Sequence, residues 1–383
     1  MIKKPNFLII GSTGRNTGKT EFVCSLIAKY SATQPVIGLK VTTINKKEGK
    51  CPRGGEGCGV CGSLTGDYEI IKETSLKGDK DTSRMLVAGA HEVFWLKVSS
   101  TALDKGLEAL LKVVPEDMPV ICESNGLRNV LEPGLFLVIK NLKDSTIKPN
   151  CARVIRFATR IIEFDNLSWN FQPDRVILKN SRWIIRNPAT AIVLAGGKSS
   201  RMGEDKSMLP INGKPLIAHI VDQLKDSFDE IIIGANDPEK YSFLNLPVIH
   251  DLEKDRGPLM GIYSCLRASG NERNFTTACD IPTMNIELIN NMLQIAEDVD
   301  IVMPVGKENH YEPLFSVYNK SVIPIAETVL NNNCRRIIDL LNFAKTRFID
   351  FDNSNWYENL NHKVDYLNFI EGEKSRDCYR DLS

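Results

Sequence analysis

The chain has 383 residues, of which 42% are hydrophobic and 25% are charged, the balance of a globular protein with enough length for two domains. Its 48 Lys and Arg residues offset 48 Asp and Glu residues, so the zero net charge argues against a nucleic-acid partner, although a few basic residues suffice for a local phosphate site. No run of about 20 apolar residues predicts a membrane helix and no signal-peptide pattern is apparent, so we expect a cytoplasmic protein without a membrane partner.

The first predicted element is a short apolar strand that leads into a glycine-rich loop ending in Gly18-Lys19-Thr20, with a helix after it. Glycines let backbone N–H groups face phosphate oxygens, Lys19 meets the β and γ charges of a nucleoside triphosphate, and Thr20 can hold Mg²⁺. Strict P-loop spacing requires a glycine at position 13, but Thr13 stands there and Gly14 follows it. We therefore predict a nucleotide site at Gly14, Gly18, Lys19 and Thr20; the alternative is an ordinary strand–helix turn.

Three clustered cysteines come next along the chain: Cys51, Cys58 and Cys61, with glycines between them. Glycines allow a tight loop in which neighbouring thiolates face one ion, and thiolates suit Zn²⁺ or an iron–sulfur (Fe-S) cluster. A tetrahedral site needs a fourth ligand, for which Cys122, His91 or a thiol of a second subunit is a candidate. The alternative is a glycine-rich loop with incidental or redox-active thiols.

A carboxylate closes the apolar strand predicted at 119–123. Beside a P-loop, the carboxyl end of a strand is the place for a magnesium partner or a water-positioning base. We therefore assign Glu123 to the nucleotide site; the alternative is an ordinary surface glutamate at a strand end.

The half from Pro5 to about Gly134 resembles the P-loop GTP-binding protein of molybdopterin-guanine dinucleotide biosynthesis, the MobB family. The matching residues are Gly18-Lys19-Thr20, Asp81-Thr-Ser-Arg84 with Ala88-Gly-Ala90, and Glu123. The resemblance implies a P-loop NTPase-like domain that binds GTP and hydrolyses it weakly in an accessory role. The histidine-rich stretch frequent in that family is replaced here by the segment that starts at Lys40.

We predict one α/β domain over 1–186 and a second over 187–383. In the second domain an apolar run at 191–194 again leads into a glycine-rich loop, and β–α units follow it. We expect strands at 230–234, 247–250, 274–278 and 301–304, and helices at 215–225, 257–269 and 285–296. This alternation predicts a mostly parallel sheet covered on both faces, as in a Rossmann-like fold.

The second glycine-rich loop fits a nucleotidyltransferase signature because it combines a double glycine with several basic residues. Arg201 and Lys206 would neutralise the β- and γ-phosphates, which become the leaving pyrophosphate. The glycines would let the backbone approach the nucleoside triphosphate. We assign to this contact Leu194, Ala195, Gly196 and Gly197.

Three polar residues follow later strands of the same domain. Asn236 ends one strand, and Asp251 follows another, where a polar group can reach the base or the ribose. Asp280 stands at the exit of a buried strand, where a single carboxylate is costly unless a metal ion or a partner compensates it. We therefore predict that Asp280 holds Mg²⁺ and that it acts in catalysis together with Arg201 and Lys206.

This domain, from about Thr190 to Phe369, resembles molybdenum cofactor guanylyltransferase, the MobA family, including the late motifs Glu312–Ser316 and Asn359–Tyr366. The resemblance implies a nucleotidyltransferase domain of the nucleotide-diphospho-sugar transferase type, with an active-site role for Asn361. It also implies transfer of GMP from GTP to molybdopterin with release of pyrophosphate.

The resemblance has one departure and leaves alternatives open. The usual Thr-Pro after the late asparagine is His362-Lys363 here. The implied partners are GTP and molybdopterin, with molybdoenzyme apo-proteins or other cofactor-biosynthesis proteins as further candidates. The alternatives are a cytidylyl- or sugar-phosphate nucleotidyltransferase, or a GTP-binding adaptor for molybdoenzyme maturation.

Overall fold

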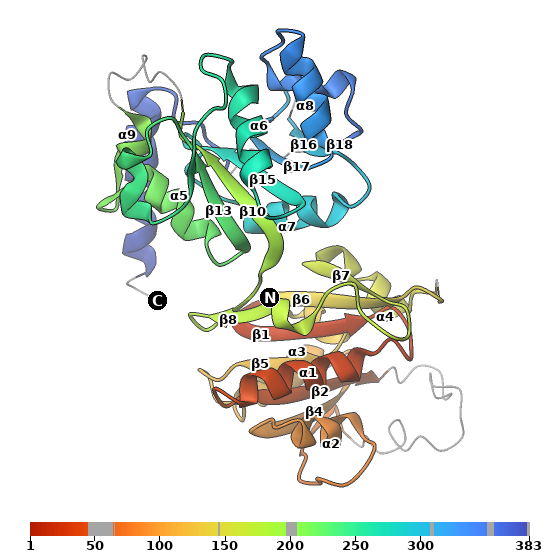
Figure 1. Cartoon of the computed structure of the whole chain (residues 1–383). Coiled ribbons are helices and arrows are strands. Elements are labelled where there is room, and N and C mark those ends of the chain that lie inside the picture. The colour runs from red at the N-terminus through yellow and green to blue at the C-terminus, as the bar shows by residue number, and fades with distance from the viewer. Residues whose placement is uncertain are drawn as a thin grey trace. The chain divides into compact units, whose positions relative to one another are not determined.

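The computed structural model describes residues 1–44, 64, 66–144, 146–196, 205–306, 310–350 and 356–380. The chain forms two compact units, Met1–Ile185 (unit 1) and Arg186–Ser383 (unit 2), and each has a sheet flanked by helices (Figure 1). None of the helices in the described ranges is long and apolar enough to cross a membrane.

Unit 1 is built on a seven-stranded sheet of order β3-β4-β2-β5-β1-β6-β7. The strands are β1 (Ile2–Ser12), β2 (Ile37–Ile44), β3 (Tyr68–Lys72), β4 (Glu92–Ser99), β5 (Val120–Glu123), β6 (Leu131–Asn141) and β7 (Arg160–Phe164). All neighbours are parallel except β3 and β4. The register sets Ile10 opposite Glu123, so the strand before the first glycine-rich loop ends beside this carboxylate.

Helices cover both faces of the unit 1 sheet, which explains why β1 is buried continuously from residue 6 to residue 12. On one face lie α1 (Lys19–Ser31) and α2 (Asp81–Val87), together with the hairpin of β8 (Val176–Lys179) and β9 (Arg182–Ile185). On the other face lie α3 (Leu103–Leu111) and α4 (Pro149–Ala152). Helix α1 buries an apolar stripe at helical spacing, formed by Phe22, Val23, Leu26, Ile27 and Tyr30.

Unit 2 is built on a second seven-stranded sheet, of order β14-β13-β10-β15-β17-β16-β18. The strands are β10 (Asn187–Leu194), β13 (Phe228–Gly234), β14 (Val248–Ile249), β15 (Arg273–Ala278), β16 (Ile301–Val305), β17 (Phe315–Asn319) and β18 (Thr346–Asp350). The mostly parallel sheet predicted from the sequence is confirmed, with one antiparallel strand, β17, inserted between β15 and β16. A small hairpin, β11 (Pro210–Ile211) with β12 (Lys214–Pro215), precedes the first helix of the unit.

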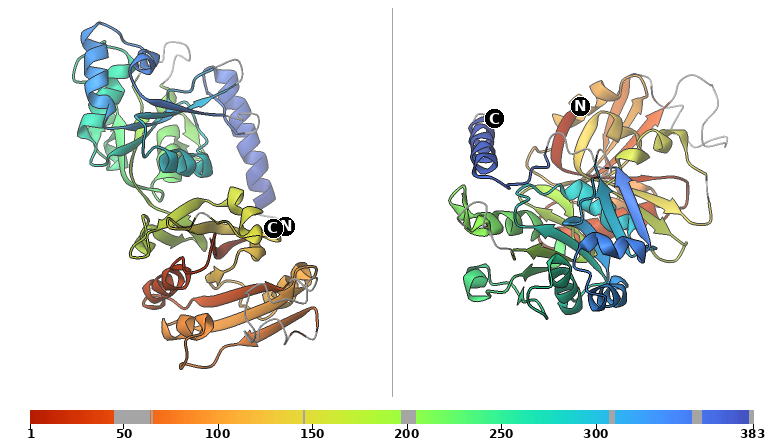
Figure 2. Two further views of the ribbon diagram at one scale, coloured as in Figure 1. Left: turned by 90° about the vertical axis from the view of Figure 1, so that its right-hand side faces the viewer. Right: turned by 90° about the horizontal axis from the view of Figure 1, so that it is seen from above.

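Two layers of helices sandwich this sheet (Figures 1 and 2). Helices α5 (Leu216–Leu224), α7 (Ile286–Ile295) and α9 (Lys363–Arg380) cover one face, and α6 (Pro258–Ala268) and α8 (Val322–Asn331) cover the other. Strand β10 serves both cores because its side chains alternate: Val193 packs with the first layer and Ile192 with the second. The predicted helices at 215–225, 257–269 and 285–296 are present with slightly shorter bounds.

Candidate active site

Three strands of unit 2 end together and form the floor of a cavity. The register pairs Leu194 with Gly234 on one side and with Ala278 on the other, so the loops after β10, β13 and β15 leave the sheet side by side. The cavity has a volume of about 560 Å³. It is lined by Leu194, Ala195, Gly196, Asp205, Lys206, Gly234, Ala235, Asn236, Asp251, Asp255, Gly257, Pro258, Gly261, Ala278, Cys279, Asp280 and Leu314.

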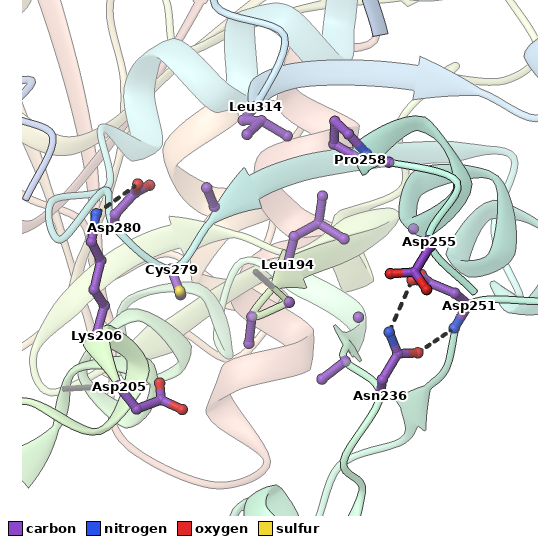
Figure 3. A pocket seen from close by; sticks show the side chains of 17 residues that line it. Leu194, Asp205, Lys206, Asn236, Asp251, Asp255, Pro258, Cys279, Asp280 and Leu314 are labelled. Atoms are coloured by element: carbon purple, nitrogen blue, oxygen red, sulfur yellow. Dashed lines mark hydrogen bonds and ion pairs between the residues drawn. The ribbon is translucent and has the colours of Figure 1, made fainter. Parts of the chain in front are cut away.

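One end of the cavity carries a lysine and a carboxylate (Figure 3), and an amide adjoins the lysine. Lys206 Nζ lies 3.7 Å from Asp280 Oδ2 and donates a hydrogen bond of 3.2 Å to Asn361 Oδ1. The backbone N–H of Leu360 donates to the carbonyl oxygen of Asp280 at 2.8 Å, which holds the late asparagine beside this end. The cluster therefore combines one cation and two oxygen groups at the exit of the sheet.

The short turn that carries Lys206 is held by polar contacts, most of them partly buried. Asp205 Oδ1 accepts hydrogen bonds from the backbone N–H of Ser207 at 3.0 Å and from its hydroxyl at 2.7 Å, which caps a short 3₁₀ turn. The Ser207 hydroxyl also contacts the Tyr241 hydroxyl at 3.0 Å, and Tyr241 donates to the carbonyl of Ala195 at 3.3 Å. These contacts tie the lysine loop to the glycine-rich loop after β10.

The other end of the cavity is formed by an amide–carboxylate pair (Figure 3). Asn236 Nδ2 donates to Asp251 Oδ2 at 2.9 Å, and the backbone N–H of Asp251 donates to Asn236 Oδ1 at 2.9 Å. Beside the pair, α6 begins at Pro258 after Gly257, which has a φ of 78°. A Cβ on Gly257 would lie 3.0 Å from the carbonyl oxygen of Arg335, so glycine suits this position in both conformation and space.

The structure brings most of the predicted residues of this domain into one cavity. Leu194, Ala195, Gly196, Lys206, Asn236, Asp251 and Asp280 line it, and Asn361 adjoins it through Lys206. Gly197 and Arg201 lie outside the described residues. Sequence reasoning assigned no site role to several other wall residues, among them Asp205, Asp255, Cys279 and Leu314. Of these, Asp205 could have been recognised from its position before a short turn, as a capping residue.

Unit 1 gathers a second cluster of lysines and carboxylates at the start of α1. Lys19 Nζ lies 3.0 Å from Glu123 Oε1, and the Thr20 hydroxyl donates to Glu123 Oε2 at 3.0 Å. Lys40 lies 3.8 Å from Glu123 Oε1 and also forms an ion pair with Asp81, which accepts a hydrogen bond from Thr20 at 3.2 Å. Sequence reasoning gave no site role to Lys40 and Asp81, which reach the cluster from β2 and α2.

The charges around Glu123 shift the pKa of this buried carboxylate. Glu123 is 6% exposed, and burial by itself raises its pKa. The charges of Lys19 and Lys40 and the hydrogen bonds from Lys19 and Thr20 together outweigh burial and hold the pKa below the ordinary value. Gly18, at a φ of 67°, precedes α1 and has no side chain to cap its first N–H groups. The arrangement can therefore present backbone donors and two cations to an anion.

The predicted cysteine site cannot be placed, since Cys51, Cys58 and Cys61 lie outside the described residues. Across the ranges that the structure describes, no group of three His, Cys, Asp or Glu residues is arranged to hold a metal ion. Cys122, a candidate fourth ligand, is buried in β5, and burial raises its pKa well above the ordinary value. Burial therefore opposes the thiolate that a metal site would need.

Comparison with known proteins identifies the family of unit 2. A MobA-like NTP transferase domain matches residues 191–345. A protein of Carboxydothermus hydrogenoformans named probable molybdenum cofactor guanylyltransferase is 39% identical over 163 residues, which cover 43% of this chain and 82% of that protein. The molybdenum cofactor guanylyltransferase of Vibrio parahaemolyticus is 34% identical over 183 residues, or 46% of this chain and 93% of the relative.

Among solved structures, molybdopterin-guanine dinucleotide biosynthesis protein A from Archaeoglobus fulgidus is similar with a TM-score of 0.43 and 24% sequence identity, over 49% of this chain and 99% of that one. The matched domain, with its α/β Rossmann-like nucleotidyltransferase fold, lies within unit 2. Through unit 2, the chain belongs to the molybdenum cofactor guanylyltransferase family.

Proposed function

We infer that unit 2 transfers GMP from GTP to molybdopterin, forming molybdopterin guanine dinucleotide and releasing pyrophosphate. The observation that carries this inference is the cavity at the ends of β10, β13 and β15, with Lys206, Asp280 and Asn361 at one end and the Asn236–Asp251 pair at the other. A cation at one end suits phosphates, and hydrogen-bonding groups at the other suit a base or ribose.

Lys206 is proposed to meet the β- and γ-phosphates, together with Arg201, and to offset the charge that develops on the leaving pyrophosphate. Asn361 holds the lysine amine through the 3.2 Å hydrogen bond and so directs it into the cavity. The attacking group is a phosphate, which is already ionised at neutral pH, so the transfer needs no general base. The backbone of Leu194, Ala195, Gly196 and Gly197 is proposed to contact the nucleotide.

The donor set at Asp280 fits Mg²⁺. Its carboxylate supplies hard oxygen ligands at the cavity wall, which suit Mg²⁺. Mg²⁺ held by Asp280 would supply charge neutralisation on the phosphates.

The inference is tested by incubating the purified chain with Mg²⁺, molybdopterin and each nucleoside triphosphate in turn. We expect dinucleotide and pyrophosphate from GTP. Product from CTP alone would favour the cytidylyl alternative, and turnover of sugar phosphates without molybdopterin would favour a sugar-phosphate nucleotidyltransferase.

We also propose that unit 1 is an accessory P-loop domain that binds GTP, as its resemblance to the MobB family implies, and that it assists delivery to molybdoenzyme apo-proteins. The support is the convergence of Lys19, Thr20 and Glu123 at the start of α1, with both P-loop side chains 3.0 Å from the carboxylate. The oxygen atoms of Thr20, Glu123 and Asp81 form a hard donor set that fits Mg²⁺.

Counting the bound nucleotide tests this second site. The intact chain should bind two GTP molecules in equilibrium dialysis, and Lys19→Ala should bind one while keeping transferase activity. Two GTP molecules on the variant, or one on the unaltered chain, would contradict the proposal. For Cys51, Cys58 and Cys61, metal analysis of freshly purified protein should find zinc or iron, and replacement of the three by serine should remove it.

A further inference from the structure

Glu312 is a buried carboxylate to which the proposed reaction gives no role. The residue is 7% exposed. Its Oε2 accepts a hydrogen bond of 2.7 Å from the Tyr357 hydroxyl, and its Oε1 lies 3.6 Å from Nε2 of His310, whose side chain is 75% exposed. Burial raises the pKa of Glu312, and the hydrogen bond from Tyr357 opposes the rise. Such an acid is costly to keep unless donors compensate it.

Glu312 lies just before strand β17, near the end of the cavity that carries Lys206 and Asp280. Strands β15 and β17 are antiparallel neighbours, and the backbone N–H of Ala278 donates to the carbonyl of Leu314 at 3.1 Å. Asp280 stands two residues after Ala278, and Glu312 stands two residues before Leu314. Since Leu314 itself lines the cavity, the carboxylates of Asp280 and Glu312 flank the same edge of the sheet.

Tyr357 connects Glu312 to this edge. It belongs to the segment that runs past Asp280, where Leu360 donates to the Asp280 carbonyl at 2.8 Å. Burial raises the pKa of the Tyr357 hydroxyl, and both Glu312 and Asp280 raise it further, so the hydroxyl lies in the field of both carboxylates. The hydroxyl donates to Glu312 and so holds that carboxylate in one orientation.

Aromatic rings accompany the carboxylate. The rings of Trp356 and Tyr357 lie 5.5 Å apart between centroids, and they pack on Phe315 at 5.5 and 5.7 Å. Phe315 is fully buried, whereas Trp356 and Tyr357 are half-buried. The cluster therefore offers a flat heterocycle both an apolar surface and a hydrogen-bonding acid.

The direction of transfer places the acceptor on this side. Figure 3 shows Lys206 with Asp280 at one end of the cavity and Asn236 with Asp251 at the other. With the nucleotide lying between these ends, its phosphates lie at the Asp280 end, and the acceptor phosphate approaches them from the side of the neighbouring strand β17, where Glu312 lies. We propose that Glu312 binds the pterin ring of the acceptor there, a proposal that rests on the function inferred above.

The chemistry of a pterin matches this carboxylate. Its 2-amino-4-oxopyrimidine edge presents two parallel donors, N3–H and the 2-amino group, and an ionised carboxylate accepts both in one plane. These donors would favour the charged form of Glu312 and so compensate its burial. Tyr357 continues to donate to Oε2, while the exposed His310 can move away from Oε1.

Glu312→Gln tests the assignment, because it keeps the size of the side chain but replaces one acceptor by a donor that faces the 2-amino group. We expect the KM for molybdopterin to rise about 10- to 100-fold, with kcat and the Kd for GTP changed by less than about twofold. The control is Glu358→Gln, the same change at the exposed neighbour of Tyr357, which should leave all three unchanged. An unchanged KM in folded Glu312→Gln would overturn the assignment, as would a KM and a GTP Kd that rise together with a lowered melting temperature.

A binding experiment separates this proposal from the reaction itself. The full chain is titrated, with tryptophan fluorescence as readout, with pterin-6-carboxylate and with its analogue that lacks the 2-amino group. The unaltered chain should bind the first about tenfold more tightly, and Glu312→Gln should bind the two equally. Equal affinities in the unaltered chain, or a preference that survives the substitution, would refute the role of Glu312. Should the preference hold while no dinucleotide forms from GTP, the proposed function fails and the pterin site stands.

Discussion

Each unit brings a lysine and a carboxylate together where a glycine-rich loop follows a central strand, but the two pairs differ in spacing and burial. In unit 1, Lys19 lies 3.0 Å from Glu123, whose side chain is 7% exposed. In unit 2, Lys206 lies 3.7 Å from Asp280, whose side chain is 29% exposed, and both line the cavity of about 560 Å³. A lysine that is paired with a buried acid contributes to the stability of the fold as well as to ligand binding. A lysine whose carboxylate partner is farther away and more exposed is available to bind phosphate. We therefore expect substitutions in unit 1 to act mainly through stability and those in unit 2 mainly through chemistry.

The largest expected effect is the loss of transfer in Asp280→Asn. The substitution removes the charge that is proposed to hold Mg²⁺ and keeps the size of this partly exposed side chain, so kcat for GMP transfer should fall by about 10²- to 10³-fold. The melting temperature should change little. The measurement is pyrophosphate release at saturating GTP, with the exposed Asp298→Asn as a control of the same chemistry. If Asp280→Asn lost much of its stability as well as its activity, the two lysine–carboxylate pairs would not differ in the way that we propose.

The matching change in unit 1 should act in the opposite way. Glu123→Gln removes the carboxylate that pairs with Lys19 and leaves Lys40 with Asp81, so we expect unit 1 to lose about 2–3 kcal/mol of stability. GMP transfer by unit 2 should stay within about twofold. Hydrogen exchange of β5 peptides measures the loss without assuming that the two units unfold together.

A surface pair gives the control for this change. Glu132 lies 3.9 Å from Lys3, and both side chains are exposed, so Glu132→Gln should cost less than about 1 kcal/mol. Equal losses in the two variants would show that burial of the Glu123 cluster contributes nothing.

The central strands of both units can be predicted from the sequence. Apolar runs at 7–10 and 191–194 predict the central strands, because a strand covered on both faces excludes polar side chains along its buried length. The helices of unit 2 follow from their apolar spacing. Strand β17 was missed since its sequence, Phe315–Asn319, mixes apolar with polar residues that become buried only through pairing with β15 and β16.

The candidate sites show where sequence reasoning ends. Residues next to a glycine-rich loop or at the end of an apolar strand, such as Lys206 and Asp280, are recognisable one strand at a time, and their roles stay predictions. The pairing of Lys40 with Asp81 depends on how helix α2 packs near strand β2, since 41 residues separate the two. The Glu312–Tyr357 contact spans 45 residues and depends on the antiparallel insertion of β17. Long-range contacts of this kind are decided by topology, which local patterns do not specify.

A smaller effect should come from the amide that positions Lys206. Asn361→Ala removes the 3.2 Å acceptor of the lysine amine but leaves Asp280 in place, so transfer should fall about tenfold. Because Lys206 keeps Asp280 as its ion-pair partner, the melting temperature should stay close to that of the unaltered chain. Steady-state kinetics with GTP as the varied substrate measures the loss. A decrease as large as that of Asp280→Asn would mean that the amide itself contacts the reacting groups.

The smallest effect should be a pH dependence of opposite sign in the two units. The pKa of Glu123 is lowered in the folded state because the charges of Lys19 and Lys40 and the hydrogen bonds from Lys19 and Thr20 together outweigh burial. Its contribution to stability is therefore present above the unfolded value of 4.5 and is lost as pH falls through the folded pKa. Burial raises the pKa of Glu312, so its folded form keeps the proton longer, and the stability of unit 2 declines as pH rises from 4.5 through the folded pKa. Hydrogen exchange of β5 and β17 peptides between pH 3.5 and 7 separates the two slopes. Glu123→Gln should flatten the dependence of stability on pH in unit 1, and Glu312→Gln should flatten it in unit 2. Slopes of the same sign in the two units would mean that the two buried carboxylates do not experience different charge environments.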